Sequence, residues 1–282
     1  MPQHHTLEEL SEADAFGRVA DIYAELRRLS GVPVVALIFR HLATHDGLLD
    51  QIWAALRPLL TTGVLQDAAA RVVDENIPPD LIPPIDANVR CALGFDGVRM
   101  PPVLNAIDAY NRANAINLLI MLSLLRRLEL SDSTVEPVPT RAWSPPAPIA
   151  GPLSRMMSPA EMPSHIRRMV NDFGFGDRTR LDPVVPSLLR HLCDAPGLLA
   201  ILHVVLTPKF KDLTLTNAIA KLTAAMAQEA ARLAPHIGLL PRLAAIPSAR
   251  LVVEEFTGSW IPQMTVIGFA LRRSLLDTQR LD

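Results

Sequence analysis

Asparagine side chains recur along one apolar segment of the chain. Asn111, Asn114 and Asn117 stand three residues apart within YNRANAINLLIML, so a helix would place them on neighbouring positions of one face. A buried amide that lacks a hydrogen-bond partner lowers stability. These amides therefore either bond to the backbone or to buried water between helices, or are presented to a ligand, and the sequence leaves both readings open.

Two histidines occupy equivalent places in a repeated segment. His41 lies in PVVALIFRHLATHDGLLDQIWAALRPLL (33–60) and His191 in PVVPSLLRHLCDAPGLLAILHVVLTPKF (183–210), and the two segments align without a gap. Eleven of their 28 positions are identical, which is enough to indicate one design used twice. A histidine can act as a base near neutral pH. Its presence in both halves also fits a shared structural role.

Elements that position these residues are expected to be helical. Hydrophobic residues make up 49% of the chain but aromatic residues only 5%, which favours helices over strands, and no useful period-2 pattern occurs. The predicted fold is all-α: two homologous helical repeats packed as a pseudo-dimer and joined by a Pro-rich linker. We expect the first repeat at 1–129, the linker, with eight prolines, at 130–163, and the second repeat at 164–282. The cleft between the repeats is the expected site.

The helical periods can be assigned to ranges along the chain. The expected helices are 7–29, 33–44, 48–60, 63–75 and 103–129 in the first half, and 160–173, 213–233 and 262–278 in the second, where the repeated segment occupies 183–207.

Composition argues against several classes of partner. A net charge of −2 and a pI near 6.4 give no case for nucleic acid or an anionic membrane. The longest apolar run, 113–125, is shorter than the ~20 residues of a membrane span. Cys91 and Cys193 fit neither a disulfide framework nor a metal site, so a cytoplasmic protein without a metal is expected. Abundant apolar helix faces favour a homodimer.

The repeats diverge at 36–39 and 186–189. These residues begin the repeated helices, where free backbone N–H groups and the positive end of the helix dipole can hold a carboxylate. A small organic acid is therefore the expected ligand.

Three segments together resemble the group I 2-haloacid dehalogenases, which hydrolyse D- and L-2-haloalkanoic acids. They are VPVVALIFRHLATHDGLL in the first half, YNRANAINLL in the long helix and PSLLRHLCDAPGLL in the second half. The resemblance implies an all-helical pseudo-dimer with its site between the repeats and no cofactor. It also implies that an aspartate activates water, which displaces halide directly with inversion.

The resemblance assigns roles to particular positions. The family's site asparagine falls on Asn114, and its serine falls on Ser187. The family's aromatic pocket residues fall on Val34 and Leu37, which leaves those positions apolar but without rings. The catalytic aspartate falls on Leu188, which cannot accept a proton.

A hydrolase therefore needs another base, and His191, three residues beyond Leu188, is the candidate. Three functions follow. The first is hydrolysis of a small 2-substituted carboxylic acid with a rearranged base. The second is binding of a small organic acid without that chemistry, and the third is a structural helical protein. A polar pocket with Asn114 and Ser187 would favour the first two over the third, and a titratable group within its reach would separate the first from the second.

Overall fold

The computed structural model describes residues 7–95, 97–130, 134–173 and 185–276, and all regular structure in these ranges is helical. The all-α prediction is confirmed. The α-helices are α1 (Gly17–Ser30), α2 (Leu37–Leu42), α3 (Leu48–Thr61), α4 (Val64–Asn76), α5 (Ala87–Ala92), α6 (Met100–Glu129), α7 (Ser164–Asn171), α8 (Ser187–Leu192), α9 (Pro196–Lys211), α10 (Thr214–Leu233), α11 (Pro241–Ala245), α12 (Pro247–Glu255) and α13 (Ile261–Leu276). Two 3₁₀ turns, Pro159–Glu161 and Ala234–His236, and a π-helix, Phe256–Trp260, complete the order.

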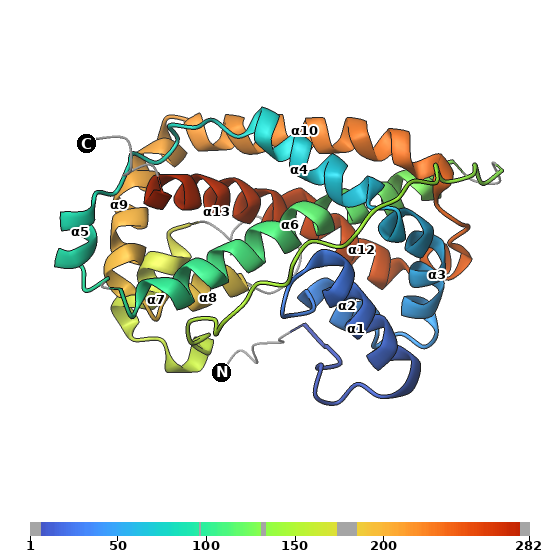
Figure 1. Cartoon of the computed structure of the whole chain (residues 1–282), viewed down its shortest axis with the longest axis horizontal. Helices are drawn as coiled ribbons and strands as arrows, with labels where there is room; N and C mark the ends of the chain where they lie inside the picture. The colour runs from blue at the N-terminus through green and yellow to red at the C-terminus, as the bar shows by residue number, and fades with distance from the viewer. Residues whose placement is uncertain (1–6, 96, 131–133, 174–184, 277–282) are drawn as a thin grey trace.

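Helices α6 and α13 form the centre of the molecule and lie side by side (Figure 1). Arg272 of α13 donates two hydrogen bonds to Asp108 of α6, at 2.5 and 3.0 Å. One turn further along α6, Asn111 touches Gly268 of α13. The register is therefore antiparallel, and it brings the stretch of α6 after Asn111 opposite the start of α13. Because α6 comes from the first half of the sequence and α13 from the second, the core joins both halves.

The repeated segments form two matching pairs of helices around this centre. In each pair a six-residue helix, α2 or α8, precedes a longer one, α3 or α9. Figure 1 shows α2 and α8 on the same side of α6, with α4 and α10 along the opposite side. Pro58 and Pro208 lie inside α3 and α9, and both helices continue past them. A pseudo-twofold relation between the halves stays a prediction.

Two helix starts in the first half of the chain were predicted too early. The first helix begins at Gly17, because Phe16 is extended (φ −138°, ψ 166°). Its expected earlier part instead packs beside α2, where the Leu10 N–H donates to the Arg40 carbonyl at 2.9 Å. The helix expected from residue 33 begins at Leu37, since the Val35 N–H bonds to the Glu12 carboxylate at 2.7 Å. The start expected at residue 183 lies outside the described residues.

A proline-rich segment without helix or strand, residues 134–158, runs along the outside of the bundle (Figure 1). We call this segment the strap. Side chains of α6 hold it: Arg112 donates to the Ala147 carbonyl at 2.9 Å, and Asn105 donates to the Ala150 carbonyl at 3.0 Å. Among the described helices, none is long and apolar enough to cross a membrane.

Candidate ligand-binding site

A cavity of about 80 Å³, counted as space open to the centre of a water-sized sphere, lies where α2 and α8 begin against α6 and α13. Roughly 10–15 Å³ of such space is enough to hold one water, so this cavity has room for more than one water or for a small molecule. It is lined by Val34, Ala36, Leu37, Ile38, Tyr110, Ala113, Asn114, Asn117, Pro186, Ser187, Leu188, Phe256, Trp260, Ile261 and Met264. Both halves of the sequence contribute to it.

The structure brings most of the sequence-predicted site residues together in this cavity. Val34 and Leu37 line it from the α2 side, Ser187 and Leu188 from the α8 side, and Asn114 from α6. These segments are far apart in the sequence, and the packing of α2 and α8 on α6 makes them neighbours. His191 is not part of the lining.

His191 serves as an anchor for the strap. Its Nδ1–H donates to the Ser154 carbonyl at 2.6 Å, and its ring lies 5.3 Å from that of Tyr110. His41 makes the equivalent bond, to the Glu8 carbonyl at 2.8 Å. Both imidazoles are buried, and burial lowers their pKa more than the carbonyl bonds raise it. The histidines thus share a structural task, and the geometry offers His191 no direct role as a base in the cavity.

One face of α6 supplies most of the polar lining. Tyr110, Asn114 and Asn117 follow the i, i+4, i+7 spacing that aligns side chains along a helix. Asn117 is buried, with 6% of its surface exposed. No side-chain hydrogen bond joins Asn114 or Asn117 to another described residue. Two amides therefore face the cavity with their hydrogen-bonding capacity unused.

Asn111, the third member of the asparagine series, has a different environment. It is buried between α6 and α13, and its Oδ1 has no hydrogen-bond partner. A Cβ atom added to Gly268 would lie 2.1 Å from this oxygen and 3.2 Å from Cδ2 of Leu188. The side chains of Asn111 and Leu188 thus both lie against Gly268, which has no side chain to separate them. Asn111 lies behind Leu188 and is not itself part of the lining.

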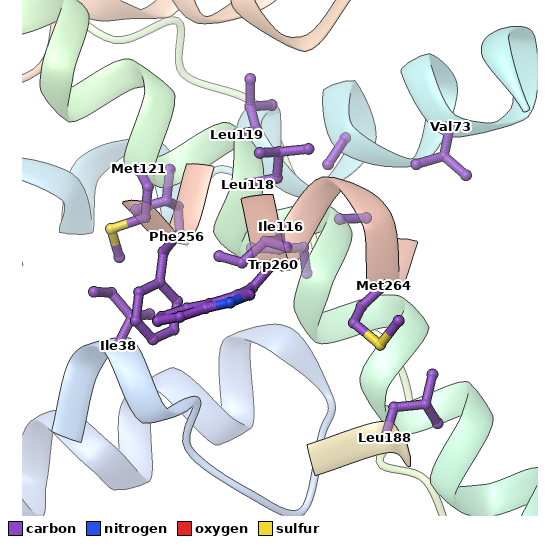
Figure 2. Close-up of a cluster of buried hydrophobic side chains, with 14 of the residues drawn as sticks. Ile38, Val73, Ile116, Leu118, Leu119, Met121, Leu188, Phe256, Trp260 and Met264 are labelled. Atoms are coloured by element: carbon purple, nitrogen blue, oxygen red, sulfur yellow. The ribbon is translucent and has the colours of Figure 1, made fainter. Parts of the chain in front are cut away.

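Leu188 fills the position at which the resemblance implies a carboxylate. Only 1% of its surface is exposed, and it packs among other apolar side chains (Figure 2). Of the side chains that line the cavity, all from the described part of the chain, none carries a charge at neutral pH.

Tyr110 is the titratable side chain of the lining. Burial raises the pKa of its phenol, while the Ser187 hydroxyl and the charges of Arg40 and Arg190 lower it to a smaller extent. The phenol therefore stays protonated at neutral pH. It can donate a hydrogen bond to a ligand, but it cannot take a proton from water.

The helix starts contribute less to binding a carboxylate than the sequence predicted. Helices α2 and α8 contain six residues each, too few for a strong dipole. Leu37 opens α2 and Ser187 opens α8, so both starts do border the cavity. Their role is to bring these side chains and their backbone N–H groups to it.

The apolar wall opposite α6 was missed by sequence reasoning. Phe256 and Trp260 are the first and last residues of the π-helix between α12 and α13, and Met264 lies one turn further along α13. Residues four apart in an α-helix are rotated by about 40° beyond one full turn, and the wider π turn reduces this rotation. Phe256 and Trp260 therefore lie close together, with 4.7 Å between their ring centroids. Figure 2 shows Phe256 and Trp260 beside Ile38 of α2, with Met264 directed towards Leu188 of α8.

Comparison with solved structures supports the fold. A D-2-haloacid dehalogenase in complex with L-LA superposes with a TM-score of 0.76 at 15% identity, over 96% of this chain and 97% of that one. A mutant of D-2-haloacid dehalogenase with D-2-CPA gives 0.74 at 16% identity, over 95% and 94% of the two chains. Another D-2-haloacid dehalogenase mutant gives 0.73 at 15% identity, over 98% and 96%.

No family model and no curated protein matches the chain. The chain therefore has a haloacid dehalogenase-like fold, and at these identities the likeness establishes the fold alone.

Proposed function

We propose that this protein binds a small organic acid in the cavity between α2, α6, α8 and α13. The observation that carries the proposal is the pair of unpaired amides, Asn114 and Asn117, in an otherwise largely apolar cavity. Amides that line a cavity without a protein partner are available to a ligand, because polar groups there need hydrogen bonds from water or a bound molecule. A bound molecule with hydrogen-bonding groups supplies these bonds.

Local charge favours an acid over a base. The charges of Arg40 and Arg190, one from each repeat, lower the pKa of the Tyr110 phenol, and the opposing effect of Glu12 is smaller than either, so together they favour negative charge at that point. A carboxylate beside the Tyr110 hydroxyl experiences the same field. Neutral donors can hold such a group, since a carboxylate accepts several hydrogen bonds at once.

Hydrolysis of 2-haloacids is the second candidate, supported by the fold shared with D-2-haloacid dehalogenases. It requires a base beside the reacting carbon, and general-base help is commonly worth about 10²–10⁴ in rate. Leu188 cannot serve, and Tyr110 holds its proton. His191 lies outside the lining. Binding without this chemistry therefore accounts for the site better.

The test uses D- and L-2-chloropropionate with the purified protein. At a concentration of about 100 Kd, binding stabilises the folded state by about 2.7 kcal/mol, or about 5 °C in Tm. We expect this rise in Tm without release of chloride. Asn114→Leu removes the central amide and should abolish the rise. Ser123→Ala, on α6 but bonded to the Leu119 carbonyl, should retain it.

Two results would overturn the proposal. Chloride release by the wild-type protein, at a rate proportional to enzyme, would make it a hydrolase. A Tm unchanged by either acid, at concentrations up to tens of millimolar, would remove the case for acid binding.

A further inference from the structure

The cavity has two ends that differ in composition. At the α8 end, Tyr110, Ser187 and Leu188 come together. At the α2 end lie Ile38, Phe256 and Trp260 (Figure 2). The antiparallel register of α6 and α13 brings Asn117, on the same face as Tyr110 but two turns later, towards the start of α13 and hence to the α2 end.

Polar groups are therefore present at both ends. Seven residues separate Tyr110 from Asn117, and at 1.5 Å for each residue this is about 10 Å along the axis of α6. Asn114 lies between them. A ligand with polar atoms only on adjacent carbons reaches one end and leaves the other unsatisfied.

The two ends also differ in charge. The fields of Arg40 and Arg190 act at the Tyr110 hydroxyl. Asn117 is buried and lines the same cavity as Phe256 and Trp260, and its amide offers one acceptor and two donors without charge. The α8 end thus suits a carboxylate, and the α2 end suits a hydroxyl, carbonyl or amide group.

We propose that the ligand is bifunctional: an acid whose carboxylate lies at Tyr110 and Ser187, and whose far end carries an uncharged hydrogen-bonding group that pairs with Asn117. This inference rests on the proposed function, because it assumes that an acid binds in the cavity. A cavity of about 80 Å³ suits a small molecule. A four-carbon acid with a terminal hydroxyl group is small and carries polar groups at both of its ends, and Phe256 and Trp260 cover its methylene groups.

The test compares 4-hydroxybutyrate with pentanoate by isothermal titration calorimetry. These acids have the same number of non-hydrogen atoms and differ in that a terminal hydroxyl replaces a methyl group. We expect the wild-type protein to bind 4-hydroxybutyrate at least tenfold more tightly, since pentanoate leaves the buried Asn117 amide unpaired.

Asn117→Leu replaces the amide with an apolar side chain of similar shape, and it should reverse the preference in favour of pentanoate. Ser187→Ala should weaken both acids by similar factors, because it acts at the shared carboxylate. Ser123→Ala should leave the ratio unchanged. The Asn117→Leu result is a gain of pentanoate binding, which an unfolded variant cannot produce.

The outcomes separate this inference from the proposed function. If neither acid binds and chloropropionate also fails, the proposed function itself is wrong. If the wild-type protein binds both acids equally or prefers pentanoate, the bifunctional ligand is wrong while acid binding stands. An unchanged ratio in a folded Asn117→Leu variant has the same meaning.

Discussion

Replacing Leu188 with aspartate puts a carboxylate at the point where the resemblance implies a catalytic base. The side chain is 1% exposed and borders the cavity beside Tyr110 and Ser187. Leu188→Asp removes a buried apolar side chain, which costs about 2–5 kcal/mol of folding free energy. Burial will raise the pKa of the new carboxyl above its usual value of about 3.9 and so improve it as a base near neutral pH.

Asn111 is placed to assist that carboxylate. Its Oδ1 lacks a partner, and its side chain meets that of Leu188 on the surface of Gly268. A rotation of the amide would turn its NH₂ group towards the carboxylate, and such a hydrogen bond favours the charged form. Leu188→Asn is the matched control, because it has the shape of aspartate without the basic oxygen pair.

The assay is chloride release from D- and L-2-chloropropionate, with folding checked by urea denaturation. We expect release by Leu188→Asp at about 10²–10⁴ times the rate of Leu188→Asn, the usual range for general-base catalysis. A folded Leu188→Asp protein that binds the acid but releases no chloride would refute the reasoning. So would equal release by the wild-type protein, which would show that another group supplies the base.

Two further predictions concern stability. Gly268→Ala should destabilise the protein by about 1–3 kcal/mol in urea denaturation, because the added methyl group would overlap the buried Asn111 side chain. Gly258→Ala is the control and should not destabilise it in this way, since its methyl group meets nothing within 4 Å. Equal effects of the two substitutions would contradict the packing of Asn111 on Gly268. Burial holds the pKa of His41 and His191 below that of an unfolded chain, near 6.5, so the unfolded state binds more protons below this pH. The free energy of unfolding should therefore fall as the pH drops below about 6.5 and be retained above it, and His191→Gln should reduce the fall measured between pH 7.5 and 5.0.

The sequence predicted the helices wherever a continuous apolar period defines them. The long helix α6 and the helices α3, α4 and α10 lie within a few residues of their expected ranges. Tertiary contacts decided the starts that were missed. The bond from Val35 N–H to Glu12 holds the residues before α2 out of the helix, and a contact across 23 residues leaves no local signal.

The site was predictable only in part. The repeat, the amide spacing and the resemblance together led to Asn114, Ser187 and Leu188, which lie in recognisable motifs and line the cavity. Phe256 and Trp260 belong to neither motif, and they begin and end a π-helix that the sequence did not predict. The aromatic pair in FTGSW around Gly258 was the available signal.

Proton NMR of the wild-type protein with racemic 2-chloropropionate would examine binding and chemistry in one sample. Saturation transfer from the protein to the methyl group of the acid reports binding, and growth of a lactate methyl signal over hours reports hydrolysis. We predict saturation transfer that Asn114→Leu abolishes, with no lactate formed beyond the protein-free control. Lactate formation by the wild-type protein, or the absence of any transfer, would contradict the assignment of this cavity as an acid-binding site without a catalytic base.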